Sequence, residues 1–529
     1  MSINDHLIKT GADGRLDGTS TAQIDKLIRR LSKEQRVVIH LHGGLVSTKN
    51  GIASAAELEP EYEAAGAYPV YFIYRTGLLE IVRNNLGEIA REKIFQRLLV
   101  KIIKFVMGKL TDFGGRSTSA ALALPTEREV RIELQKCRQN IEPFVAVAPA
   151  PAAAATGRGG AAAVRGLTAT EKEQFLDDLS TDPDLQTELQ EIINGAGDVV
   201  GEHSRMAARA GGSAASRATM MSEHVVHELV GDGSAKDARG VYSSAKFFAH
   251  AMKVLGRVIS RFRSGRDHGV YATVVEELAR ELYLDNVGRL VWNTMKKETA
   301  QTFESGSAGD VRGGRYFVDA LSQMVAASEN PPEITVVAHS LGSVFACNLM
   351  ADIRKAQKDA QHPWPKDYLV ENLIFLAPAV EHSVFAKTIG RDSAAFRHFR
   401  MFSLNDTLES GYWEVPVVYP RSLLYLVSGA FEETDKGDGA FDRPLVGMQR
   451  YHTRATVYRM ADVKKVRDYL NVRGLARAVW SETPANARAG QRSDAIEHAT
   501  FNDVKFPPGE KKRRATVDSL RHIIRNGMN

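Results

Sequence analysis

The sequence contains only two cysteines, Cys137 and Cys347, among its 529 residues. They lie far apart and match no zinc or redox spacing, so we expect reduced core thiols and neither a disulfide framework nor a metal centre. The first residues, MSINDHLIKTGADGRLDG, lack the basic, apolar and small-residue regions of a secretory signal. We therefore expect a cytoplasmic protein.

Long apolar runs and a strong charge imbalance are also missing. No uninterrupted apolar stretch reaches the ~18 residues needed to cross a bilayer. The formal charge of +5, from 69 basic and 64 acidic residues, is small for so long a chain. Since no basic and aromatic module accompanies this charge, we expect no nucleic-acid partner. Hydrophobic residues make up 43% and charged residues 25%, as in ordinary soluble globular proteins.

Short β-rich runs separated by helical patterns predict an α/β fold, with a mostly parallel sheet and helices on both faces. The six predicted strands are residues 36–41, 68–74, 334–338, 373–377, 399–404 and 455–460. The first, third and fourth are nearly continuous apolar runs, which is typical of strands buried on both faces.

About 250 residues separate the second and third predicted strands, far more than an ordinary connection needs. We expect a large helical insertion there, because residues 272–303 carry an apolar helical period that Gly288 interrupts. Residues 146–166 are rich in Ala, Pro and Gly and are typical of a linker. The predicted parts are a first part of the core at 1–84, an insertion or lid at 85–325, a second part of the core at 326–460 and a C-terminal part at 461–529.

An amphipathic segment lies near the start of this insertion, at residues 93–107. Its apolar stripe consists of Phe95, Leu98, Leu99, Ile102, Ile103 and Val106, and its other faces carry Lys93, Arg97, Lys101 and Lys104. We favour a lid helix packed on the core. The alternative is a helix that lies on a membrane surface, which would suit a lipid substrate.

The strongest motif is the segment ITVVAHSLGS at 334–343, where an apolar strand leads through a tight turn into a helical pattern. A nucleophile elbow places a serine on such a strained turn, and small residues two before and two after it let strand and helix approach. Ala338 and Gly342 take these places around Ser340. We therefore predict Ser340 as a nucleophile, the alternative being a structural serine in a strand–helix turn.

A hydrolase needs backbone N–H donors aimed at the oxyanion of its tetrahedral intermediate. Leu341 follows the nucleophile at a helix N-terminus, where the helix dipole also favours negative charge. The second donor is expected in the turn after the first predicted strand, which reads His-Gly-Gly-Leu at 42–45. Glycine lets the backbone approach a ligand closely. We favour the N–H of Gly44 and leave Gly43 and Leu45 open.

A serine hydroxyl needs a histidine to take its proton and a carboxylate to orient that histidine. The order serine, acid, histidine along the chain favours Asp406, directly after the fifth predicted strand, with Glu381 in reserve. An aspartate in that place is also a common helix cap. For the base we favour His498 over His452, because His452 precedes the sixth predicted strand.

Together these motifs resemble the α/β-hydrolase superfamily, near its lipase and esterase branches. The resemblance rests on HLHGGL at 40–45, AHSLG at 338–342, SLNDTL at 403–408 and HATFND at 498–503. The last is similar to a frequent H-G-x-F-x-x-D ending. Ala338 and Ala499 stand where many relatives have glycine, and the 42–45 turn has two glycines where one esterase branch has three. The resemblance does not extend to the long insertion.

The resemblance implies ester hydrolysis through an acyl-enzyme, in which Ser340 attacks, His498 moves the proton, Asp406 holds the imidazole, and Leu341 and Gly44 bind the oxyanion. It implies no cofactor and no metal. A small-molecule or lipid ester is the leading substrate, and a thioesterase or an amidase is the alternative enzyme. A hydrolase-like interaction protein without activity is the other alternative, but it predicts broken catalytic positions and here all five are intact.

Overall fold

A computed structural model provides the structure of the chain. It describes residues 2–44, 47–74, 78–113, 166–206, 219–230, 236–283, 289–306, 309–358, 364–390, 395–415, 418–432, 442–506, 509 and 512–528.

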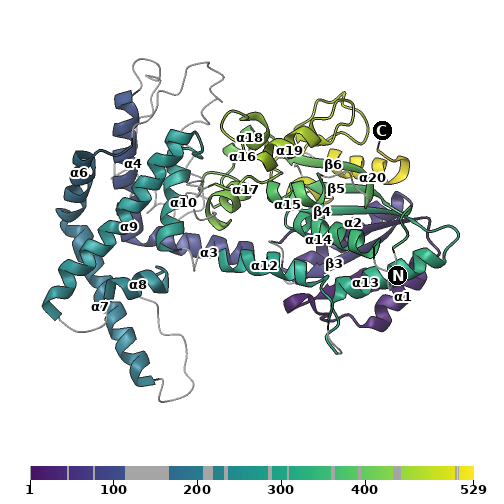
Figure 1. Cartoon of the computed structure of the whole chain (residues 1–529), viewed down its shortest axis with the longest axis horizontal. Coiled ribbons are helices and arrows are strands. Elements are labelled where there is room, and N and C mark those ends of the chain that lie inside the picture. Colours follow the sequence, from purple (N-terminus) through teal and green to yellow (C-terminus); the bar gives the residue numbers. More distant parts are fainter. Residues whose placement is uncertain are drawn as a thin grey trace.

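Seven parallel strands form one sheet in the order β1-β3-β2-β4-β5-β6-β7 (Figure 1). The strands are β1 (Leu7–Thr10), β2 (Arg36–Leu41), β3 (Tyr68–Tyr74), β4 (Glu333–His339), β5 (Val370–Leu376), β6 (Phe396–Leu404) and β7 (Ala478–Ser481). Because all strands run the same way, their carboxyl ends meet at one edge, where ligands bind in open α/β sheets.

The first five predicted strands are confirmed as β2 to β6, and the predicted α/β class is correct. The sixth prediction, 455–460, is wrong. The backbone turns there instead, since the N–H groups of Val457 and Tyr458 both donate to the carbonyl of Arg454. The strands that the sequence did not reveal are β1 and β7, which have four residues each and lie at the two edges of the sheet.

Helices cover both faces of the sheet, and buried side chains form a separate apolar cluster on each face. One face carries α1 (Thr21–Leu31), α13 (Gly313–Ala327), α14 (Gly342–Ala356), α15 (His382–Thr388) and α19 (Ala461–Leu470). The other face carries α2 (Thr48–Ala64) and α20 (Ala515–Asn526). Strand residues alternate between the clusters, as the period of two requires: Val37 and Ile39 point to the first and Val38 to the second.

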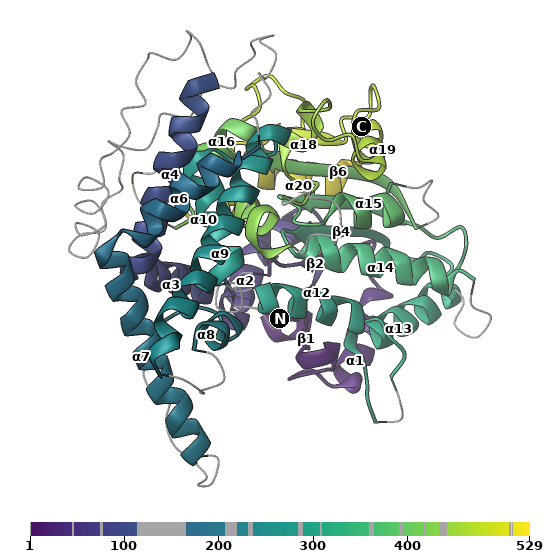
Figure 2. The same cartoon turned by 60° about the vertical axis from the view of Figure 1, so that its left-hand side comes forward.

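Most of the described residues between β3 and α13 are helical, and most of these helices stand to one side of the sheet in both views (Figures 1 and 2), although the last of them packs on α14. They comprise α3 (Leu78–Arg91), α4 (Lys93–Phe113), α6 (Ala169–Ser180), α7 (Pro183–Met206), α8 (Glu223–Val230), α9 (Lys236–Ser264), α10 (Val270–Leu282) and α12 (Arg289–Gln301). We call them the helical insertion. The predicted linker at 146–166 lies outside the described residues except for Gly166. The predicted boundaries stay predictions, and α13 packs on α1 beside the sheet although it lies within the predicted range of the insertion.

The amphipathic segment 93–107 lies in α4, and its apolar stripe is buried within the insertion except at Ile103, which is partly buried. Its cations contact acidic residues: Lys93 pairs with Glu188 at 2.7 Å, and Arg97 with Asp184 at 2.5 Å. This is the packing expected of an insertion helix. Peripheral membrane contact through 93–107 stays a prediction. Among the described residues, no helix is long and apolar enough to span a bilayer.

Short elements after β6 bring the C-terminal third of the chain to the edge where the strands end. They are α16 (Asp406–Gly411), α17 (Leu423–Leu426), η3 (Val427–Phe431), α18 (Gln449–Thr453) and η4 (Thr500–Asn502). Of these, η3 packs against α10 of the insertion. The insertion therefore contacts the core beside the segment that follows β6.

The start of α14 crosses the end of β2 so closely that only glycine fits at Gly342. A Cβ there would lie 2.3 Å from the carbonyl oxygen of Leu41 and 3.0 Å from that of His42. Ala338, two residues before Ser340, is fully buried and pairs in register with Leu41 and Phe375. This is the physical reason for small residues on both sides of the serine.

We predict that Gly342→Ala destabilises the protein by ~3 kcal/mol, because backbone atoms rather than a flexible side chain oppose the new methyl group. Gly256→Ala in α9 is the matched control, since its Cβ would meet no described atom within 4 Å. Gly256→Ala should raise the free energy of unfolding by up to about 1 kcal/mol, because alanine has a higher helix propensity than glycine. Urea unfolding of both variants measures the difference. Equal stability changes would contradict this view of the crossing.

Candidate active site

Ser340 lies on a strained turn between β4 and α14. Its φ of 52° is in the left-handed region, which a residue with a side chain rarely adopts. Backbone hydrogen bonds hold the turn in place. The N–H of Ser340 donates to the Leu376 carbonyl at 2.8 Å, and the Ser340 carbonyl accepts from the N–H groups of Ser343 and Ala379. Ser340 is 2% exposed, and its Oγ has no hydrogen-bond partner among the described residues. A strained, unbonded serine hydroxyl is thus presented at the carboxyl end of β4.

The glycine turn after β2 lies directly against this serine. A Cβ on Gly43 would lie 3.4 Å from the Cβ of Ser340, and a Cβ on Gly44 would clash with the side chain of Leu341, at 2.4 Å. Leu341 precedes the first turn of α14, which no side chain caps. Of the three residues considered for the second oxyanion donor, Gly43 and Gly44 are therefore beside the serine, and Leu45 lies outside the described residues.

His42 holds the glycine turn in place. Its Nδ1–H donates to the Gly43 carbonyl at 2.7 Å, its Nε2 accepts from the Tyr74 N–H at 3.2 Å, and Tyr74 stacks on the ring. Burial lowers the pKa of His42 to about 4, so the ring is neutral and keeps this donor–acceptor pattern. Because the carbonyl and N–H of a trans peptide point in opposite directions, the Gly44 N–H points away from His42.

His498 lies in the loop between β7 and η4, beside the residue that precedes the nucleophile. Its carbonyl accepts from Nε2–H of His339 at 3.0 Å, and the two rings are 5.4 Å apart. His498 is 7% exposed, and neither of its ring nitrogens bonds to a described residue. Burial, and then the neighbouring His339, lower the pKa of His498 well below its usual value. The imidazole is thus neutral at pH 7 and able to accept a proton.

The rival base, His452, is engaged away from these groups. Its Nε2–H donates to the Val446 carbonyl at 2.9 Å, and its ring lies near those of His382 and Trp480. We ranked His452 below His498 because it precedes the sixth predicted strand. That reason is wrong, since residues 455–460 are not a strand. The preference for His498 rests instead on its place after β7 and on its contact with His339.

Asp406 begins α16, directly after β6. The helix cap is its neighbour Asn405, whose side chain accepts from the Leu408 N–H at 3.0 Å, so Asp406 is not used for capping. Its Oδ1 accepts from the hydroxyl of Tyr425 at 2.6 Å, and its N–H donates to Oε1 of Gln449 at 3.0 Å.

Glu381, the reserve acid, follows β5 rather than β6. Its carboxylate lies 3.4 Å from Nζ of Lys296 in α12. Lys296 also pairs with the buried Glu432. Glu381 therefore belongs to an ion-pair cluster between the insertion and the core.

Ser340, His498 and Asp406 thus follow β4, β7 and β6, but no hydrogen bond joins their side chains in the described structure. The predicted triad stays a prediction. His42 and His339 lie within the predicted motifs, but their supporting contacts, like that of Tyr425 with Asp406, join residues distant along the chain and were not predicted.

No group of three or more His, Cys, Asp or Glu side chains in the described residues is arranged to hold a metal ion. His224 and His227, which are spaced three apart as metal ligands on a helix can be, lie exposed on α8. The candidate site presents a serine hydroxyl, an imidazole, a carboxylate and backbone N–H groups.

A family model described as an alpha/beta hydrolase of unknown function (DUF900) matches residues 299–407. The matched segment runs from the end of α12 to Thr407 and contains the Ser340 elbow and Asp406. The match supports membership in the α/β-hydrolase superfamily. The match ends before His498 and leaves most of the helical insertion outside. No curated protein and no solved structure matches the chain.

A second carboxyl group lies three residues after Asp406. Glu409 is fully buried in α16, and its Oε2 accepts from the Ser422 hydroxyl. Burial raises the pKa of Glu409 to about 8; the Ser422 hydrogen bond opposes this shift, and the charges of Asp406 and Glu414 add to it. At neutral pH the folded protein therefore keeps a proton on Glu409.

We predict that Glu409 makes stability fall as pH rises from about 4.5 to about 8, because the folded state then binds a proton that the unfolded chain releases. The slope should approach about 1.4 kcal/mol per pH unit. Glu409→Gln should flatten it, since the amide is neutral throughout. Unfolding measured across this range tests the prediction, with the exposed Glu304→Gln as control. An unchanged slope in Glu409→Gln would contradict it.

Proposed function

We propose that the protein is a serine hydrolase that cleaves an ester through a covalent acyl-enzyme on Ser340. The observation that carries the proposal is the strained Ser340 turn, packed against a glycine turn on one side and next to the His498 loop on the other. Strain of this kind persists where a side chain must be presented in a fixed direction. The match of residues 299–407 to an alpha/beta-hydrolase family model supports the reaction class.

In the proposed mechanism, Oγ of Ser340 attacks the ester carbonyl while His498 takes its proton. The oxyanion forms against the N–H groups of Leu341 and Gly44, and His498 returns the proton to the leaving alcohol. Water then attacks the acyl-enzyme: His498 takes the proton of the water and returns it to Oγ of Ser340 as the acid leaves. Asp406 orients the imidazole. Without substrate, catalytic hydrogen bonds are often long and tighten only in the complex, which is how we interpret the unbonded rings of His498.

For the substrate we propose a small-molecule or lipid acyl ester, acted on in the cytoplasm, with 93–107 as a candidate membrane contact. A thioester or an amide would use the same groups. The burial of Ser340 and His498, joined by no hydrogen bond in the described structure, favours one competing function, a hydrolase-like interaction protein. Covalent labelling separates that function from an enzyme.

We predict that a fluorophosphonate probe labels the wild type and that Ser340→Ala and His498→Ala abolish labelling. Asp406→Asn should slow it by up to about 10⁴-fold, because the imidazole loses its orienting carboxylate. His452→Gln and Glu381→Gln are matched controls on the rival base and acid and should label like the wild type. Unlabelled wild type, also with detergent and a smaller probe, would contradict the enzyme proposal, and labelling of Ser340→Ala would move the nucleophile.

We also predict that the labelling rate falls at acidic pH with a midpoint below 6.5, because burial and His339 lower the pKa of His498. Below that midpoint the imidazole is protonated and no longer accepts the serine proton. Labelling rates measured from neutral to acidic pH on folded protein test this. A midpoint at or above 6.5 would show that the group controlling the rate is not this buried histidine.

A further inference from the structure

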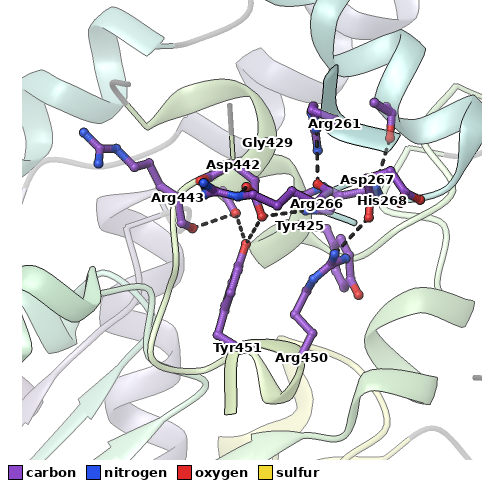
Figure 3. A network of polar contacts seen from close by, with 12 residues as sticks. Arg261, Arg266, Asp267, His268, Tyr425, Gly429, Asp442, Arg443, Arg450 and Tyr451 are labelled. Atoms are coloured by element: carbon purple, nitrogen blue, oxygen red, sulfur yellow. Dashed lines mark hydrogen bonds and ion pairs between the residues drawn. The ribbon is translucent and has the colours of Figure 1, made fainter. Parts of the chain in front are cut away.

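A buried polar network joins the helical insertion to the segment that follows β6 (Figure 3). From the insertion come Arg261, Glu276 and Glu277, each at most 1% exposed, with Arg261 paired to both carboxylates at 2.6 and 3.0 Å. Arg266 pairs with the fully buried Asp442 at 2.5 Å. Such a network is costly to break, because removing one partner leaves a buried charge without compensation.

The charges of this network compensate one another. Burial alone would raise the pKa of Glu276, but His268 and Arg261 outweigh it and lower the pKa to about 2. Arg266 and His268 likewise hold the pKa of Asp442 well below its usual value, against the effect of burial. The two carboxylates therefore stay ionised at neutral pH.

Tyr425 is the residue through which the network reaches Asp406. Its hydroxyl donates to Oδ1 of Asp406 at 2.6 Å. Its ring contacts two groups of the network: the guanidinium of Arg450, 5.2 Å from the ring centroid, and the ring of His268, 4.7 Å away and edge-on. Burial raises the pKa of Tyr425, so the hydroxyl keeps its proton and acts as the donor.

Arg450 ties this arrangement to the insertion. It donates to the carbonyl of Asp267, between α9 and α10, at 2.8 Å and to the hydroxyl of Tyr458 at 3.1 Å. The residue before it, Gln449, accepts the backbone N–H of Asp406 at 3.0 Å. The side chain and the backbone of Asp406 are thus both held by residues anchored in the network.

We propose that Tyr425 is a positioning residue for Asp406 and that the helical insertion, through His268 and Arg450, holds Tyr425 in place. The inference rests on the proposed function. A carboxylate orients an imidazole only if its plane is fixed, and a hydrogen bond to Oδ1 fixes that plane while leaving Oδ2 for His498. The insertion is then part of the catalytic framework and does more than cover the site.

The test compares Tyr425→Phe with Tyr283→Phe in the full-length protein. Both tyrosines are buried and donate to a carboxylate, but the partner of Tyr283 is Glu92 within the insertion, at 2.9 Å. With p-nitrophenyl butyrate as probe, Tyr425→Phe should lower kcat about tenfold, the effect of one positioning hydrogen bond, and leave KM unchanged. Tyr283→Phe should keep the wild-type kcat. The unfolding temperature should fall in both variants, because each loses a buried hydrogen bond.

The decisive measurement is the kcat of the double variant Tyr425→Phe/Asp406→Asn, compared with the kcat of Asp406→Asn alone. A residue that acts only through Asp406 should then have no further effect on kcat, whereas a structural loss would lower it again. Gln449→Met, which removes the acceptor for the Asp406 N–H, serves as a second variant if Tyr425→Phe does not fold.

Failure of the proposed function can be distinguished from failure of the role of Tyr425. Hydrolysis that survives Ser340→Ala, or no hydrolysis by the wild type, overturns the proposed function and this inference with it. Hydrolysis that depends on Ser340 but falls equally in Tyr425→Phe and Tyr283→Phe, or falls additively with Asp406→Asn, overturns the role of Tyr425 alone.

Discussion

The close crossing of α14 over the end of β2 is the constraint on which the candidate site depends. At Gly342 the helix backbone lies against the carbonyl of Leu41, with no room for a methyl group. The chain must therefore turn sharply between β4 and α14, and Ser340 takes the left-handed conformation that this turn requires. The same approach brings the glycine turn after β2 to Leu341. One packing contact thus positions the nucleophile and both candidate oxyanion donors.

The parts of the fold that were predictable from sequence are those with a strong local pattern. The central strands β2, β4 and β5 are continuous apolar runs, and the elbow adds small residues at fixed spacing to a strand and a helix. The edge strands β1 and β7 are too short to carry a pattern. Residues 455–460 have strand-forming composition, yet the buried hydroxyl of Tyr458 bonds to Asp442 and the backbone turns. Tertiary contacts override local propensity there.

The candidate site divides in the same way. Ser340, Leu341 and Gly44 belong to local motifs, and the structure brings them together. Asp406 and His498 were inferred from their order along the chain, and their side chains are not joined by hydrogen bonds in the described structure. Tyr425 and Arg450 could not be predicted, because Arg450 bonds to Asp267 across 183 positions and no local pattern encodes such a contact. The family match covers the elbow and Asp406 but neither the His498 loop nor the polar network.

Ser340 is proposed as a nucleophile set against two backbone N–H donors. A crystal structure of the protein after reaction with a phosphonate inhibitor tests it most directly. We expect phosphorus bonded to Oγ of Ser340, a phosphonyl oxygen within hydrogen-bond distance of the N–H groups of Leu341 and Gly44, and the His498 ring beside the adduct with Asp406 behind it. An adduct on another residue, or an oxygen on Ser340 that faces no backbone donor, would contradict it.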